Sequence, residues 1–256
     1  MIGGNEMISV LSKEINGLPV LELVSENKQN EALPLVIFYH GWTGCKEQVL
    51  TQGYELAKQN LRVILPDALY HGQRQVGNVL AHQFEFWQIV VNSVKEFPQI
   101  VEYYRKLNLI KNQQIGVSGL SMGGITTCAL FSVYDWISAA VCLEGSPCPI
   151  QFAKLLIETM PGIENIAPEY INKQLEQLAS IDLSHNPQKI AKRPLHFWHG
   201  TADEMVPYQP TKDFYDCIKD HSYAQNVTFT TTPGAKHKVS YETTLEMAEK
   251  FAKYFK

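Results

Sequence analysis

From residue 35 onward, the chain alternates short apolar runs with longer amphipathic stretches, and this alternation restricts the fold more than any other feature of the sequence. Each run has the continuous apolar character of a strand that is buried on both faces of a sheet. The runs are Leu35–Tyr39, Val63–Leu65, Ile115–Val117, Ala139–Leu143 and Leu195–Trp198, followed by the more polar Val227–Thr231. Strands that alternate with helices predict an α/β fold, in which a mostly parallel, twisted sheet has helices on both faces and right-handed crossovers.

Helical patterns occupy the stretches between these runs. We expect helices at Glu47–Gln59, Phe84–Leu107, Ser121–Tyr134, Tyr208–Lys219 and Tyr241–Phe255. Ahead of the first run, the segment ISVLSKEINGLPVLELV has two alternating halves joined at Asn16-Gly17, which is a strong hairpin signal. An antiparallel hairpin should therefore precede the parallel part of the sheet.

One connection between strands is much longer than a single crossover requires. Residues 146–187 contain two helical stretches, Ile150–Met160 and Pro168–Ala179, which Pro161-Gly162 separates. Loops at the carboxyl ends of strands are where an open α/β sheet binds ligands. We therefore expect one domain, residues 1–256, with a small helical cap inserted at 146–187. An ordinary excursion packed on the sheet is the alternative.

The composition limits the partners. Hydrophobic residues make up 45% of the 256 residues and charged residues 19%, which excludes a chain that is disordered throughout. The 22 basic and 26 acidic residues give a formal net charge of −4, and there is no basic run. Neither nucleic acid nor an anionic membrane is therefore expected as a partner.

The cysteines and the N-terminus indicate the compartment. Five cysteines, without a CxxC pair, favour reduced thiols over a disulfide framework or a zinc site. The N-terminus MIGGNEMISV lacks a signal-peptide pattern, and no stretch approaches the roughly 18 consecutive apolar residues of a membrane helix. We expect a soluble cytoplasmic protein. Met7 is an alternative start, with MIGGNE as a leader.

A candidate nucleophile lies between a buried strand and an apolar helix. The segment Gly119-Leu120-Ser121-Met122-Gly123 has the pattern G-x-S-x-G in this strand-turn-helix setting. Such a turn holds the serine in a strained conformation and requires small neighbours, which Gly119 and Gly123 supply. The Met122 amide would lie at a helix N-terminus, where it can stabilise an oxyanion. A serine in an ordinary glycine-rich turn is the alternative.

A serine nucleophile needs a base and an orienting acid from later in the chain. Of the eight histidines, His237 lies in a glycine-containing loop between the last strand and the last helix, from which it could reach back over the sheet. Asp203, in the loop after the strand Leu195–Trp198, is the predicted acid. Glu204 and Glu144 are alternative acids, and a surface role for His237 or a helix N-cap role for the acids is the competing interpretation.

The second oxyanion amide should come from the loop after Leu35–Tyr39, in the segment His40-Gly41-Trp42-Thr43-Gly44. Gly41 permits a sharp turn. We assign the amide to Trp42, with Thr43 as the alternative, and the Trp42 side chain can equally form a wall of the pocket.

Five motifs in this order resemble those of an α/β-hydrolase. They are HGWTG, PDALYHGQR, GLSMGG, HGTADEMVP and GAKH, and they span residues 35–256. The chain is similar to the bacterial carboxylesterase branch that groups with prolyl-oligopeptidase-like and dienelactone-hydrolase-like serine hydrolases. The resemblance implies Ser121 as nucleophile, Asp203 as acid and His237 as base. The sequence departs from dienelactone hydrolases proper, which use cysteine, and lacks the propeller domain of prolyl oligopeptidases.

Two further groups of residues lie near the predicted site. Asp67, His71 and Arg74 follow a strand exit, where they either brace the loops around the nucleophile, as in similar proteins, or contact substrate. Phe84, Phe86 and Trp87 occupy a helix start, and their spacing fits core packing.

Together these features predict a serine carboxylesterase that hydrolyses small esters with short acyl chains through an acyl-enzyme. It needs no metal or organic cofactor, and a small-molecule ester is its expected partner. Peptidase or amidase, acyltransferase and perhydrolase activities on the same triad are alternatives. So is a non-catalytic module that binds a small ligand. The sequence indicates no oligomeric state.

Overall fold

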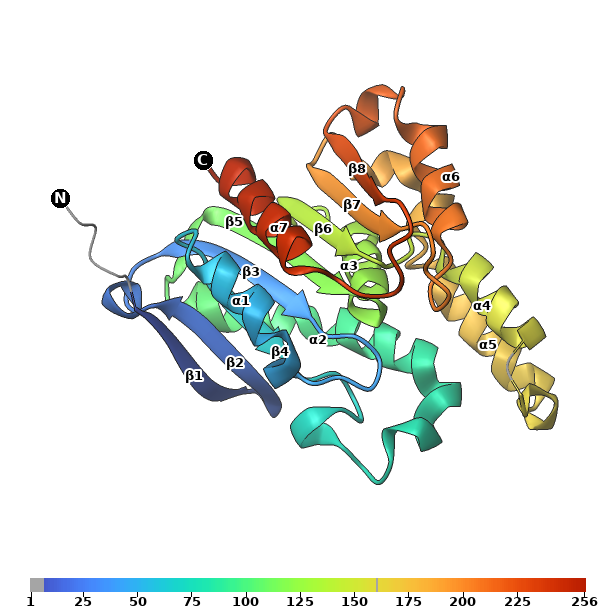
Figure 1. Ribbon diagram of the computed structural model, residues 1–256. Helices are drawn as coiled ribbons and strands as arrows, with labels where there is room; N and C mark the ends of the chain where they lie inside the picture. The colour runs from blue at the N-terminus through green and yellow to red at the C-terminus, as the bar shows by residue number, and fades with distance from the viewer. Residues whose placement is uncertain (1–6, 160) are drawn as a thin grey trace.

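An eight-stranded sheet organises the described part of the chain, residues 7–159 and 161–256 of a computed structural model (Figure 1). Its strands lie in the order β1-β2-β4-β3-β5-β6-β7-β8. They are β1 (Ile8–Ile15), β2 (Leu18–Ser25), β3 (Leu33–Tyr39), β4 (Arg62–Pro66), β5 (Ile110–Leu120), β6 (Ala139–Leu143), β7 (Leu195–Gly200) and β8 (Val227–Thr232). The predicted MIGGNE leader, residues 1–6, lies outside the described residues.

The predicted antiparallel hairpin is confirmed. Strand β1 pairs antiparallel with β2, and β2 pairs antiparallel with β4, while the remaining neighbours are parallel. Asn16 and Gly17 form the turn with φ of 50° and 83°. Both values are positive, as a tight turn between two twisted strands requires.

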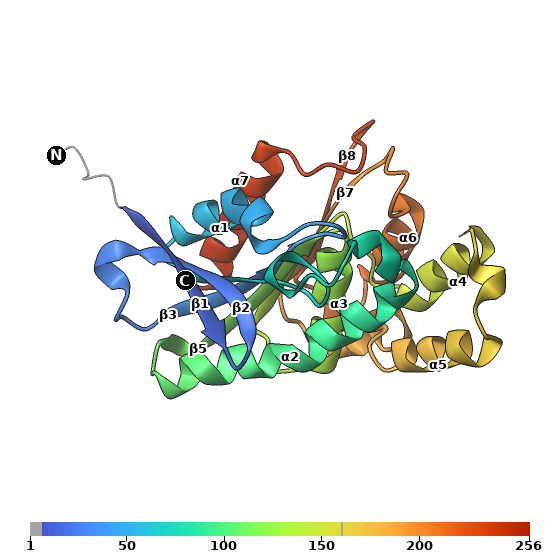
Figure 2. The ribbon, with the colours of Figure 1, turned by 90° about the horizontal axis from the view of Figure 1, so that it is seen from below.

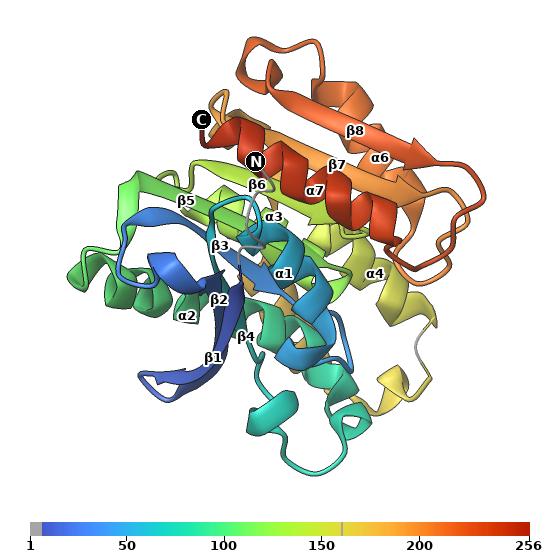
Figure 3. The same ribbon diagram turned by 60° about the vertical axis from the view of Figure 1, so that its left-hand side comes forward.

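Helices cover both faces of the sheet, which confirms the predicted α/β class. Figure 2 shows α1 (Leu50–Ala57) and α7 (Tyr241–Tyr254) on one side and α2 (Phe86–Lys106) and α3 (Met122–Val133) on the other. Helix α6 (Tyr208–Ile218) packs on the α3 side, where Phe214 and Ile218 join the same apolar core. In Figure 3, α1 and α7 lie side by side along the sheet.

Two helices begin later than the sequence predicts. Residues Lys46–Val49 form a 3-10 turn, so α1 begins at Leu50 and not at Glu47. The amide and the ammonium of Lys46 both bind the Asp67 carboxylate, which holds this turn against β4. A second 3-10 stretch, Val79–Glu85, precedes α2.

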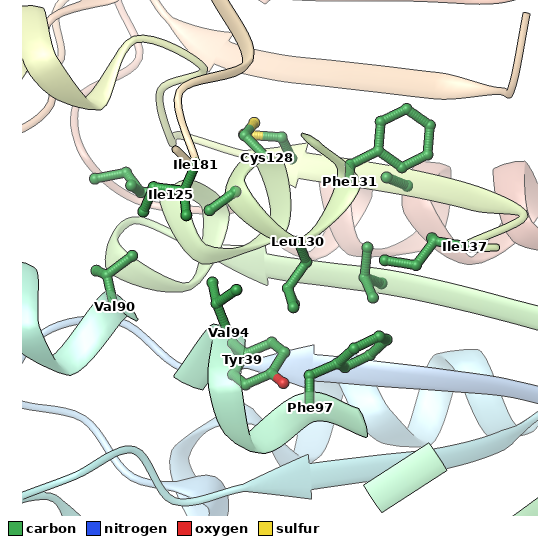
Figure 4. Packing of buried hydrophobic residues seen from close by; sticks show 14 of the residues in the cluster. Tyr39, Val90, Val94, Phe97, Ile125, Cys128, Leu130, Phe131, Ile137 and Ile181 are labelled. Atoms are coloured by element: carbon green, nitrogen blue, oxygen red, sulfur yellow. The ribbon is translucent and has the colours of Figure 1, made fainter. Parts of the chain in front are cut away.

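Apolar packing between the helices and the sheet fixes the position of α3, which follows the candidate nucleophile. Figure 4 shows Val94 and Phe97 of α2 near Leu130 of α3, with the ring of Tyr39 of β3 beside Val94 and Phe97. Every residue of α3 from Met122 to Ser132 is buried. This packing therefore fixes the N-terminus of α3 at the carboxyl end of β5.

The long connection after β6 forms α4 (Pro149–Thr159) and α5 (Pro168–Ala179). These helices pack on each other, α5 also packs on α2, and both lie beyond the carboxyl ends of the strands (Figure 1). Met160, the predicted end of the first helix, lies outside the described residues. Within residues 7–159 and 161–256, no helix combines the length and apolar character that a membrane crossing needs.

Candidate active site

Ser121 occupies a strained turn between β5 and α3. Its φ of 56° and ψ of −119° are rare for a residue with a side chain, and such a conformation costs about 1–3 kcal/mol. The neighbouring glycines make the turn possible. A Cβ on Gly123 would lie 2.1 Å from the carbonyl oxygen of Tyr39, and one on Gly119 would lie 2.5 Å from the carbonyl carbon of Gly123. The strand and the helix can therefore approach closely, and the turn places the serine at the carboxyl end of β5.

Three side chains from distant segments meet at this turn. The Ser121 hydroxyl lies 2.8 Å from His237 Nε2, and His237 Nδ1 lies 2.8 Å from Asp203 Oδ2. Asp203 follows β7, and His237 lies in the loop between β8 and α7. In the tautomer that satisfies both contacts, the serine donates to Nε2, and Nδ1 donates to the carboxylate. The three residues singled out in the sequence thus form one hydrogen-bonded line.

Asp203 is held by donors on both of its oxygens. Its Oδ1 accepts hydrogen bonds from the amides of Met205 and Val206, at 2.9 and 3.0 Å. Its Oδ2 lies 3.1 Å from Nε2 of His199, a buried residue that the sequence analysis did not single out. Burial by itself would raise the pKa of Asp203. The hydrogen bonds from His199, His237 and the Val206 amide outweigh this and hold the pKa well below its usual range. In the folded protein, Asp203 is therefore ionised at neutral pH.

The surroundings of His237 favour its charged form. Burial alone would lower the pKa of His237, but the hydrogen bond to Asp203 and the charges of Glu144 and Asp203 raise it above the usual value. An imidazolium at this position is therefore stabilised, as expected of a base that takes a proton from a serine.

The two alternative acids are placed differently. Glu204 has an exposed side chain. Glu144 is buried, and its Oε2 lies 3.9 Å from His237 Nδ1, beyond hydrogen-bond distance. Among the described residues, one side-chain atom each of Glu144, Asp203 and His237 lie within 4.8 Å of one another. The hydrogen bond between His237 Nδ1 and Asp203 Oδ2 already engages two of these groups, so we do not assign a metal site to them.

The loop after β3 brings backbone amides next to Ser121. A Cβ on Gly41 would lie 3.4 Å from the Ser121 Cβ, so this loop passes close to the serine. The Thr43 amide donates to His71 Nε2 at 3.2 Å, whereas no hydrogen bond from the Trp42 amide is found within residues 7–159 and 161–256. Met122 is the first residue of α3, where an amide has no acceptor within the helix. The amides of Trp42 and Met122 are thus available to an oxyanion.

Asp67, His71 and Arg74 support the loops around Ser121. The buried Asp67 carboxylate pairs with the Lys46 ammonium at 2.6 Å and accepts from the amides of Lys46 and Gln73. Arg74 forms two hydrogen bonds to Glu96, at 2.7 and 2.9 Å. Since His71 also holds Thr43, the contacts of all three residues are those of a brace. Lys46 and Glu96 are partners that the sequence analysis missed, because nothing in the local pattern marks them.

Asp67→Ala is expected to lower the free energy of unfolding by about 3–5 kcal/mol, because it leaves the Lys46 ammonium buried with only the exposed Glu47 carboxylate as a partner. Urea unfolding followed by circular dichroism measures this loss. The double variant Asp67→Ala with Lys46→Met also removes the unpaired Lys46 charge and should recover much of the lost stability. A loss below about 1 kcal/mol, as for an exposed ion pair, would show that this brace contributes little.

The aromatic residues before and within α2 do more than fill the core. Trp87 is buried and packs edge-on against Phe152 of α4, as the core interpretation predicts. Phe86 is only partly buried, and its ring lies 5.6 Å from that of Trp42. Phe84, Phe86 and Trp87 line an apolar cavity between α2, α4 and α5. A row of rings thus connects the loop after β3 to this cavity.

Comparisons with known proteins agree with this architecture. The model of the prolyl oligopeptidase family matches residues 56–256. Putative esterase YitV of Bacillus subtilis (strain 168) is 39% identical over 257 residues, which cover 97% of this chain and 100% of that protein. Esterase YjfP of Escherichia coli (strain K12) is 27% identical, with 92% of this chain and 95% of that protein covered.

Solved structures share the fold at low sequence identity. TT1662 from Thermus thermophilus has a TM-score of 0.76 at 16% identity, covering 98% of this chain and 99% of that one. Est1E from Butyrivibrio proteoclasticus, solved with ferulic acid bound, has a TM-score of 0.70 at 19% identity, covering 96% and 98%. These matches confirm the resemblance that the five motifs carry. The chain belongs to the prolyl oligopeptidase family and is a hydrolase with the α/β-hydrolase fold.

Proposed function

We propose that this hydrolase is a serine carboxylesterase that cleaves small esters through an acyl-enzyme. The observation that carries the proposal is the position of His237, whose ring lies between the Ser121 hydroxyl and the Asp203 carboxylate at hydrogen-bond distance from both. A serine of ordinary pKa is a weak nucleophile and needs such a base. The names of YitV and YjfP support esters as the substrates.

The proposed reaction has two symmetrical halves. Ser121 Oγ attacks the ester carbonyl carbon while His237 Nε2 takes its proton, and the imidazolium then gives that proton to the leaving alcohol. Water attacks the resulting acyl-Ser121 ester while His237 takes a proton from it, and the imidazolium returns a proton to Ser121 Oγ as the ester bond breaks and the carboxylic acid leaves. Asp203 keeps the proton on Nδ1 and stabilises the charged ring. The amides of Trp42 and Met122 would hold the oxyanion, and one such donor is worth about 10²- to 10³-fold in rate.

We further propose that residues 146–187 form a cap whose cavity binds the acyl group. The cavity lies between the 3-10 stretch Val79–Glu85, the start of α2, and helices α4 and α5, and Leu156, Ile171 and Leu175 contribute to its apolar lining. Its volume is about 50 Å³, about a third of the roughly 150 Å³ that accommodates benzene in an engineered apolar cavity. This room suits an acyl chain of a few carbons.

Ile171→Trp is expected to fill the cavity and lower kcat/KM for p-nitrophenyl butyrate by about 10- to 100-fold, because the methylenes of the chain lose their apolar site. The kcat/KM for p-nitrophenyl acetate should change by less than about threefold, since the single methyl of its acyl group needs little room. Lys173→Trp, at an exposed position on the same helix, is the matched control. Equal losses for both esters would place acyl binding elsewhere.

A fluorophosphonate probe tests the proposed function, because it reacts with activated serines. The esterase hypothesis predicts labelling of Ser121, and a panel of p-nitrophenyl esters should favour short chains. Absence of labelling would indicate a non-catalytic ligand-binding module. Faster cleavage of matched p-nitroanilides than of esters would indicate a peptidase or amidase.

A further inference from the structure

Glu144 is a buried acid beside the candidate site that the proposed mechanism does not use. It follows β6 directly, its side chain is 4% exposed, and its Oε2 lies 3.9 Å from His237 Nδ1. That oxygen is buried and has no hydrogen-bond partner among the described residues. A buried carboxylate oxygen without a donor is costly, so the position of Glu144 needs an explanation.

The backbone fixes Glu144 relative to Ser121. Its amide donates to the Trp198 carbonyl at 2.9 Å, and the carbonyl of the preceding residue, Leu143, accepts from the Ser121 amide at 3.0 Å. Its φ of 40° is a left-handed value that costs energy in a residue with a side chain. A Cβ on Gly145 would lie 2.5 Å from the Gly124 carbonyl carbon, so the chain beyond Glu144 is pressed against α3. The carboxylate is thus held in place by the strands that also hold the nucleophile.

The charges around Glu144 stabilise its carboxylate in only one protonation state of the site. Asp203, which is ionised, repels it, whereas a protonated His237 attracts it. The Nε2 atom of His199 lies 3.1 Å from Asp203 Oδ2, the same oxygen that His237 Nδ1 contacts. Glu144 is therefore stabilised most when the His237 ring is an imidazolium, which is the state that forms as Ser121 loses its proton.

We propose that Glu144 is a positioning residue that acts through His237: its carboxylate stabilises the imidazolium and keeps the ring between Ser121 and Asp203. The proposal rests on the proposed serine mechanism. Burial raises the pKa of Glu144 to about 7, so the side chain carries its negative charge above that pH, where this charge helps to raise the pKa of His237.

Glu144→Gln is expected to lower kcat about tenfold with little change in KM, because the imidazolium loses a neighbouring charge while the side chain keeps its shape. The pH profile should shift as well. Activity requires a neutral His237 and so rises as the pH passes through its pKa. Removing the negative neighbour lowers that pKa, so the rise in kcat/KM moves to lower pH.

Three comparisons separate this role from a structural one. Glu204→Gln makes the same chemical change at an exposed position next to Asp203 and should leave the profile unchanged. Glu144→Asp keeps the charge and should retain most of the wild-type profile. Urea unfolding of Glu144→Gln should show no loss of stability, because the substitution removes a buried charge without a donor.

Wild-type labelling by the fluorophosphonate probe tests the serine mechanism separately. If the wild type is labelled at Ser121 and Glu144→Gln matches it in kcat and in pH profile, the role of Glu144 is refuted while the proposed function stands. A tenfold loss of kcat in Glu144→Gln with an unshifted pH profile would also overturn the proposal in favour of a packing role. A tenfold loss of kcat together with a lower free energy of unfolding would do the same.

Discussion

Ser121→Ala is expected to lower kcat for p-nitrophenyl acetate by about 10⁶-fold, to the residual rate that the oxyanion amides and substrate binding alone can give. The substitution removes the attacking oxygen but no packing contact of comparable size, so the fold and KM should change little. His237→Ala should cost a similar factor, because a serine without a base is a weak nucleophile. Steady-state kinetics on purified variants, checked for traces of wild-type enzyme, measures the loss.

The double variant provides the stricter test. If Ser121 and His237 act as one unit, removing both should cost no more than removing either. Ser118→Ala is the matched control, because Ser118 lies on β5 and its hydroxyl donates to the Val141 carbonyl, away from His237. We expect Ser118→Ala to retain activity within a few-fold. Substantial turnover by Ser121→Ala would mean that another group attacks the ester.

Asp203→Asn is expected to lower kcat by about 10⁴-fold. The amide can donate to Nδ1 of His237, which would place the ring proton on Nε2, where it blocks acceptance of the serine proton. Asparagine also lacks the charge that stabilises the imidazolium. The same steady-state assay applies, with Glu204→Gln as the control for a neighbouring charge. Full activity in Asp203→Asn combined with an inactive Glu144→Gln would make Glu144 the acid in place of Asp203.

The local features of this fold could be predicted from the sequence because each depends on a few neighbouring residues. Asn16-Gly17 fixes the hairpin turn, since both positions need positive φ. The glycines around Ser121 identify the turn after β5, because the strand and helix there approach too closely for any side chain. The alternation of apolar runs and amphipathic stretches predicts the helices on both faces.

Contacts between distant loops could not be predicted in this way. His199 supports Asp203, and Lys46 pairs with Asp67, through loop paths that no pattern in the sequence specifies. The placement of Glu144 beside His237 depends on where three strands end relative to one another. The late starts of α1 and α2 have a similar origin, because a distant residue holds each preceding 3-10 segment. Asp67 binds Lys46, and the Gln174 side chain donates to the Phe84 carbonyl.

The most direct measurement of the central claim traps the covalent intermediate. Wild-type protein mixed with p-nitrophenyl acetate, quenched in acid within the first turnover and digested, should carry the acetyl group on the peptide that contains Ser121. The release of p-nitrophenol should show a burst equal to the enzyme concentration if deacylation is the slower step. His237→Ala should give neither the adduct nor the burst. An acetyl group on a different residue, or an adduct formed equally fast without His237, would contradict the account.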